Sequence, residues 1–192
     1  LISVAPTAMR RHVEFRAGRI AMKNTNAHAS ERKIPRVNSA IGKRLLIAWL
    51  GAGTLDISYA FIASGLRGRS PLAVLQSVAS GWQGKEAYNG GLASAALGLF
   101  THYGIMLVMV SVFVWITRTR PALLRKSVIT GAVYGLGLYA VMYGIVLPLR
   151  FPEVFPRWSG WLSVTDILVH MGVGLIMALV LAGKKVRGAD SR

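Results

Sequence analysis

The chain has no cysteine, and its 192 residues include 7 acidic residues against 23 lysines and arginines. The lack of cysteine excludes disulfides, thiolate catalysis and zinc or iron–sulfur sites with Cys ligands. The motifs GxSxG and HExxH and a Walker-type phosphate loop are also missing from the sequence. We therefore expect a protein that is not an enzyme.

The basic residues are unevenly placed, although their excess gives a formal net charge of +16. They lie between long apolar runs or in the two tails, where they act as signals of membrane topology. A nucleic-acid-binding domain would instead gather them on one folded surface. We expect no nucleic-acid partner.

Four apolar runs dominate a chain that is 53% hydrophobic, with mean hydropathy +0.47. Each run is about 20 residues, the length that crosses about 30 Å of hydrocarbon. The predicted spans are Leu45–Gly65, Gly91–Thr117, Ser127–Leu147 (stopped by Pro148) and Leu162–Gly183. The fold class predicted is all-α, a polytopic membrane bundle of four transmembrane helices.

Three regions follow from these spans: a basic, disordered tail at 1–42, a four-span membrane domain at 43–185 and a short basic tail at 186–192. Ten lysines and arginines precede the first span, four lie at 118–126 and four follow the last span, against three at 66–90 and two at 148–161. The positive-inside rule then places both termini in the cytoplasm. No cleavable signal peptide is expected, because the first apolar run is too long.

The loop after the first span contains a short amphipathic helix. Ser70 is a good N-cap, Pro71 suits the first helical position, and Gly81 is predicted just past the end. Its apolar face, which reaches Trp82, would either lie along the outer membrane surface or pack onto the bundle as a lid.

Small residues recur at helical spacing in three of the spans. Gly98 and His102 continue one such stripe, Gly131 and Gly135 form another, and Gly174 lies one turn after His170. Small faces let membrane helices approach closely. They also point the His102 ring into the bundle, and such faces often mediate homo-oligomers.

Four ionisable residues interrupt the apolar runs: Asp56, His102, Asp166 and His170. A charge at the centre of a membrane helix costs at least about 2.5–3.5 kcal/mol, so each is a candidate functional residue. Counting along the helices places Asp56, His102 and His170 near mid-membrane. Asp166 lies four residues before His170, hence on the same helix face, where it could orient that ring.

Several functions can use this polar cluster. The four side chains could bond to one another as structural glue, with Asp56 bonded to His102 and Asp166 to His170, in a non-catalytic scaffold. They could form a pathway for protons or a small solute. His102 and His170 could ligate haem b, or the cluster a divalent metal, although we expect no cofactor. Hydrolysis or group transfer has the least support.

Three segments resemble the YagU-like family of small bacterial inner-membrane proteins. They are Gly98–Tyr103 (GLFTHY), the Gly131 helix that ends in Leu147–Pro148–Leu149, and Asp166–His170 (DILVH). The resemblance covers residues 45–183 and implies a four-span protein of the bacterial cytoplasmic membrane, with the loop after span one as a regular feature. This family is itself largely uncharacterised, so the resemblance implies no mechanism. The expected partner is the lipid bilayer.

Overall fold

The computed structural model describes residues 39–183, and every regular element within this range is a helix. The predicted tails, 1–42 and 186–192, lie outside it except for residues 39–42, which begin the first helix. The helices are α2 (Ser39–Gly65), α3 (Pro71–Gln83), η1 (Gly84–Tyr88), α4 (Gly91–Thr119), η2 (Pro121–Lys126), α5 (Ser127–Val141), η3 (Met142–Val146), α6 (Leu147–Arg150) and α7 (Trp161–Ala182).

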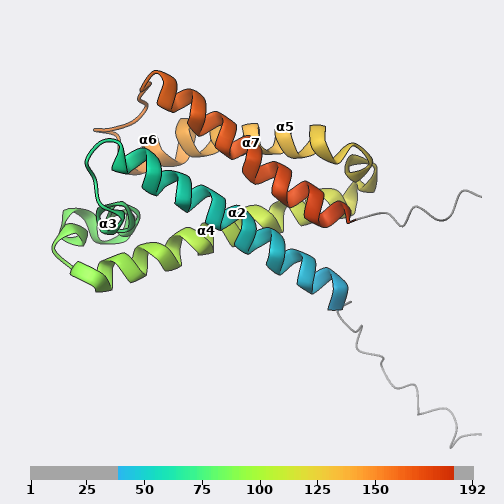
Figure 1. The fold of residues 1–192 in the computed structure, drawn as a ribbon, viewed down its shortest axis with the longest axis horizontal. Coiled ribbons are helices and arrows are strands. Elements are labelled where there is room, and N and C mark those ends of the chain that lie inside the picture. Colours follow the sequence, from blue (N-terminus) through green and yellow to red (C-terminus); the bar gives the residue numbers. More distant parts are fainter. Residues whose placement is uncertain (1–38, 184–192) are drawn as a thin grey trace, which may run out of the picture. The chain divides into compact units, whose positions relative to one another are not determined.

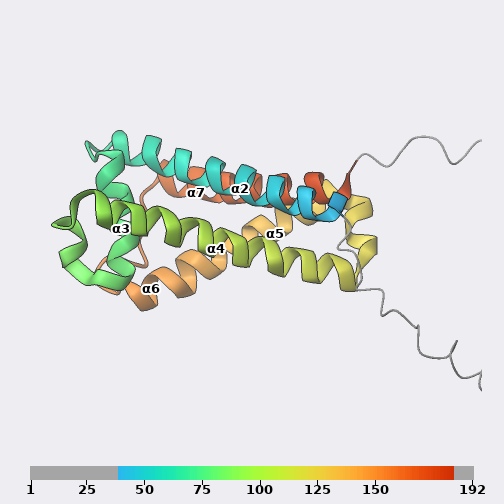
Figure 2. The ribbon, with the colours of Figure 1, turned by 90° about the horizontal axis from the view of Figure 1, so that it is seen from below.

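Four helical stretches are long and apolar enough to span a membrane: Ile41–Gly65, Gly91–Thr119, Pro121–Arg150 and Trp161–Ala182. The prediction of an all-α bundle with four such helices is confirmed, and the structure indicates a membrane protein. The helices run alongside one another, and the short helix α3 crosses one end of the bundle (Figures 1 and 2).

The third span does not stop at Pro148, as the sequence predicted. Helix continues to Arg150 because the turn Met142–Val146 is a π-helix, in which the Leu147 amide donates to the carbonyl of Met142. Proline lacks an N–H and its ring collides with the carbonyl four residues back in a regular helix. A wider turn just before the proline gives its ring more room, so the chain can remain helical to Arg150.

Helix α3 forms where the sequence predicted it, but it ends later. The Ser70 hydroxyl accepts a hydrogen bond from the Ala73 amide at 3.2 Å, which confirms the N-cap. The helix passes through Gly81 and is terminated by Gly84, whose φ of 62° is a conformation that glycine adopts readily. The terminating glycine was therefore assigned one turn too early.

The apolar face of α3 packs onto α4. Val74 and Ala79 are buried, and a Cβ added to Gly98 would overlap the backbone of Leu75. The Ser94 hydroxyl donates to the side-chain oxygen of Gln83 at 2.7 Å. The small stripe at the start of span two thus receives α3, the second of the two placements that the sequence left open.

Helices α5 and α7 make the closest contact between two spanning helices. Added Cβ atoms at Gly131, Gly135 and Gly174 would all meet backbone of the facing helix at less than van der Waals distance. This confirms the predicted role of these glycines in helix packing. Helix α2 packs against α7 on one side and against α3 and α4 on the other.

The apolar core fills the half of the bundle where α2 begins and α7 ends. Phe113, Met177, Val110 and Val173 are its largest fully buried apolar side chains. The polar residues described next lie toward the opposite end, beyond this core.

Candidate functional site

His102 is buried between α4 and α2 and contacts both the backbone and a carboxylate of α2. Its Nε2 lies 2.9 Å from the carbonyl oxygen of Gly53, and its Nδ1 lies 3.9 Å from Oδ2 of Asp56. The His102 side chain is 9% exposed and that of Asp56 is 26% exposed. Of the four residues singled out in the sequence, these two are brought together, with an imidazole nitrogen facing a carboxylate oxygen.

The carbonyl contact determines how the His102 ring can carry its protons. A carbonyl oxygen only accepts, so Nε2 carries a hydrogen and donates it to Gly53. The remaining nitrogen, Nδ1, therefore presents either a lone pair or a second proton toward Asp56.

Helix α2 also holds the neighbouring residue, Tyr103, on three sides. The Trp49 indole donates to the Tyr103 carbonyl at 2.7 Å, and the two rings meet edge to face at 5.8 Å. The Tyr103 hydroxyl lies 2.9 Å from the hydroxyl oxygen of Thr54. A Cβ at Gly53 would come within 2.7 Å of the Tyr103 ring, so glycine allows this close approach. These contacts fix the position of His102 on α4.

His170 lies in a second group, formed by α7 and α5. Its Nδ1–H donates to the backbone carbonyl of Asp166 at 2.8 Å. Tyr139 and Tyr143 place their rings edge to face with the imidazole at 5.6 and 5.8 Å, and stack on each other at 4.6 Å. The other ring nitrogen of His170, Nε2, takes no part in this hydrogen bond to the helix backbone.

The Asp166 carboxylate does not make the contact with the His170 ring that the spacing predicted. It lies near the hydroxyls of Tyr59 and Tyr143 instead. Tyr59 reaches across from α2, and its hydroxyl lies 2.7 Å from that of Thr165 and 3.2 Å from the carbonyl of Leu162. Asp166 thus orients His170 through its backbone, because a helix carbonyl four residues back is closer to Nδ1 than the carboxylate.

The two groups lie at the same depth in the bundle. Helices α2 and α7 are antiparallel, with Gly51 beside Ile176 and Leu55 over Gly172, so Asp56 is level with His170. His102 faces α2 whereas His170 faces α5, so the two rings do not share one site. Tyr143 packs on His170 and lies near Asp166, so it belongs to the second group.

These residues do not form a ready-made metal or haem site. Within residues 39–183 no group of three or more His, Asp or Glu side chains is placed to hold a metal ion. A bis-histidine haem needs a free ring nitrogen on each histidine. In His102, Nε2 is bonded to Gly53 and Nδ1 faces Asp56, so this arrangement does not fit an axial ligand.

The sequence did not identify Tyr59 and Tyr143 as members of the site, although the spacing of these residues along their helices was compatible with that role. Tyr139 and Tyr143 are four residues apart, which places their rings on one helix face, and Tyr59 follows Asp56 by three. What the spacing could not show is that Tyr143 lies in the π turn, which sets its direction.

No family model, characterised protein or solved structure matches this chain. The resemblance to the YagU-like family remains a prediction, and the functional argument rests on the geometry of the two polar groups.

Proposed function

We propose that the protein provides a pathway for protons, or for a small solute that moves together with protons, across a bacterial cytoplasmic membrane. The observation that carries the proposal is the His102–Asp56 pair, in which the geometry of Nε2 leaves Nδ1 facing a carboxylate at 3.9 Å. Ionisable groups at this depth are costly, and transporters use His and carboxylate chains to relay protons.

A series of further proton-exchanging groups continues from this pair toward the end covered by α3. Tyr143 packs edge to face on His170, which is level with Asp56, and on Phe155 of the α6–α7 loop at 5.9 Å, and it lies near Asp166. A tyrosine hydroxyl can accept one proton while donating another. Asp56, Tyr143 and Asp166 therefore offer a route from mid-membrane to one surface.

The opposite half of the route is closed in this conformation by side chains. Phe113, Met177 and Val110 are fully buried there, and the Tyr134 hydroxyl donates to the carbonyl of Met109 at 2.6 Å. An apolar, close-packed core carries no protons, so transport requires this half to open. Such opening on alternate sides is typical of transporters.

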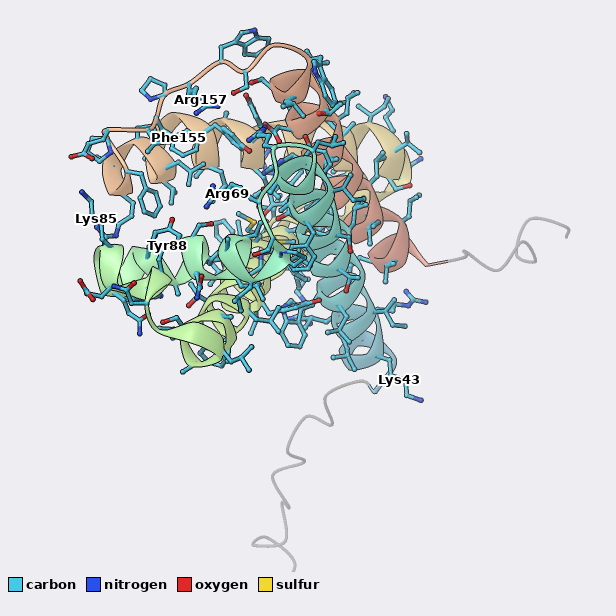
Figure 3. The ribbon with its side chains drawn as sticks, turned by 60° about the vertical axis from the view of Figure 1, so that its left-hand side comes forward. Lys43, Arg69, Lys85, Tyr88, Phe155 and Arg157 are labelled. Atoms are coloured by element: carbon cyan, nitrogen blue, oxygen red, sulfur yellow. The ribbon has the colours of Figure 1, made fainter. Side chains whose placement is uncertain are left out.

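The proposed orientation places both termini in the cytoplasm. Six of the basic residues in the described chain lie at the end where α2 begins: Lys43, Arg44, Arg118, Arg120, Arg125 and Lys126. Arg69, Lys85 and Arg157 lie at the other end, with Lys43 far from them (Figure 3). This distribution follows the positive-inside rule, and α3 would then lie on the outer side.

The pathway is tested with purified protein in liposomes that contain a pH-sensitive dye, with a potassium diffusion potential as the driving force. We expect wild-type protein to acidify the lumen and Asp56→Asn to abolish the flux, because asparagine has the same shape and cannot ionise. Arg67→Gln and Lys85→Gln are controls outside the cluster. Folded Asp56→Asn and His102→Gln proteins that retain wild-type flux would overturn the proposal.

A structural role is the second candidate, and one observation favours it. Among the described side chains, no buried nitrogen or oxygen lacks a hydrogen-bond partner. A fully bonded polar network can simply specify how helices pack. The same variants distinguish the two roles: a scaffold predicts a lower unfolding temperature for Asp56→Asn and no proton flux even in the wild-type protein.

A further inference from the structure

Four basic side chains cluster where α4 ends and α5 begins. Arg118, Arg120, Arg125 and Lys126 fall within nine residues, and all four are exposed; we call them the basic cluster. The sequence contains no acidic residue between Glu86 and Glu153. The basic cluster therefore has no carboxylate nearby along the chain.

Among residues 39–183, the fold does not bring a carboxylate to the cluster either. The connection η2 contacts α4, α5 and the end of α7, at the same end of the bundle as the start of α2 (Figures 1 and 2). The charged groups that α2 contributes there are Lys43 and Arg44, both basic, and Arg44 donates to the Leu181 carbonyl at 3.5 Å. Within residues 39–183 the one close contact between a basic side chain and a carboxylate is His102–Asp56, so no cation of the basic cluster pairs with a carboxylate of these residues.

The depth of the cluster is indicated by the residues just before it. Trp115 lies one turn before Arg118 and is 67% exposed, a position that tryptophan favours at the level of lipid headgroups. The hydroxyls of Thr117 and Thr119 bond back to their own helix, at 2.8 Å to Phe113 and 2.9 Å to Ile116. The threonine hydroxyls next to the first cations of the basic cluster are therefore hydrogen-bonded within α4.

We propose that the basic cluster binds the phosphate of anionic phospholipid headgroups, such as phosphatidylglycerol. An arginine guanidinium binds phosphate through two parallel hydrogen bonds, and three of the four cations are arginines. Zwitterionic lipids carry the same phosphate together with a compensating ammonium, so uncompensated cations select lipids with net negative charge. Free phosphate has the same chemistry but lacks the acyl chains that would lie along Trp115.

The test compares lipid binding to wild-type protein and to a variant of the cluster by native mass spectrometry in detergent. The cluster variant is Arg118→Gln, Arg120→Gln, Arg125→Gln and Lys126→Gln combined. The matched control removes four cations from the opposite end: Arg67→Gln, Arg69→Gln, Lys85→Gln and Arg157→Gln. A milder variant, Arg125→Gln with Lys126→Gln, serves if the full cluster variant does not fold or insert.

We expect wild-type protein and the control to retain phosphatidylglycerol in preference to phosphatidylcholine. Each cation removed from the cluster should weaken this binding about fivefold. Unchanged phosphatidylglycerol binding in the cluster variant or in its milder form would overturn the proposal. Full displacement of the lipid by inorganic phosphate would also overturn it, because it would show a site for free anions.

Discussion

The guanidinium Nε of Arg150 donates to the carbonyl of Gly81 at 2.6 Å, and this bond joins the last turn of α6 to the last turn of α3. A second nitrogen of Arg150, Nη2, lies 3.4 Å from the carbonyl of Ser80. A cation at the carbonyl end of a helix is favourable for the helix dipole as well as for the hydrogen bonds. One side chain thus fastens α3 to the helix that carries Tyr143.

Replacing Arg150 with Gln should loosen α3 without unfolding the bundle. Hydrogen bonds to a charged group contribute about 1.5–3 kcal/mol, so amides in Pro71–Gln83 should exchange roughly ten- to a hundredfold faster. The measurement is hydrogen–deuterium exchange by mass spectrometry. Arg157→Gln is the control, because Arg157 bonds only to Ser159 two residues along the chain. Equal exchange rates for α3 in both variants would contradict the prediction.

The glycine contact between α5 and α7 predicts a large difference between two similar substitutions. Gly135→Ala should destabilise the protein by about 1–3 kcal/mol, because its Cβ would collide with the backbone of His170 and Met171. Gly137→Ala lies two residues along the same helix with nothing within 4 Å, and should be neutral or slightly stabilising. Thermal unfolding in detergent measures both. A Gly135→Ala protein as stable as Gly137→Ala would show that the helices are further apart.

The two stacked tyrosines should differ in function although both contact His170. The Tyr143 hydroxyl lies near the Asp166 carboxylate, so Tyr143→Phe should slow proton flux about a hundredfold or more, the contribution of a positioned proton-transfer group. Tyr139→Phe keeps the stacked ring and should leave the flux near the wild-type rate. The liposome assay measures both variants. Equal rates for Tyr143→Phe and Tyr139→Phe would exclude the Tyr143 hydroxyl from the route.

The π turn should depend on Pro148. In Pro148→Ala the last turn can become regular α-helix, which rotates Leu147–Arg150 by about 100° and withdraws Arg150 from Gly81. The chain has no cysteine, so spin labels at Lys85→Cys and Leu149→Cys are unique. We expect the distance distribution between them to shift in Pro148→Ala. An unchanged distribution would show that other contacts hold the π turn.

Much of the fold was predictable because it follows from local rules. Apolar length predicted the four spans, and the Ser70–Pro71 pair predicted the start of α3. The spacing of small residues predicted that Gly135 lies at a close helix contact, but not that the facing helix is α7. The continuation of helix past Pro148 was not predictable, because it depends on which of several backbone adjustments the tertiary contacts favour.

The site was predictable only as a set of residues. Depth along each span placed Asp56 and His102 at one level, and the structure joins them. The helix spacing could not show that His102 bonds a backbone carbonyl, nor that the Asp166 carboxylate faces Tyr59 and Tyr143. These partners come from the rotation of each helix about its axis, which the hydrophobic pattern of a membrane helix defines poorly because most of its surface is apolar.

The way the helices pair has a mechanical consequence. The pairs α3–α4 and α5–α7 each approach backbone to backbone at glycine, so each pair is a closely packed unit, and α2 packs against both units. His102 lies in the α3–α4 unit and His170 in the α5–α7 unit, while Asp56 lies on α2. Tyr134 of α5 joins the two units through its hydrogen bond to the Met109 carbonyl and its packing on Phe113, both on α4. A movement of the two units away from each other would break the Tyr134 contacts and change the separation of the two histidines, while the packing within each unit is kept.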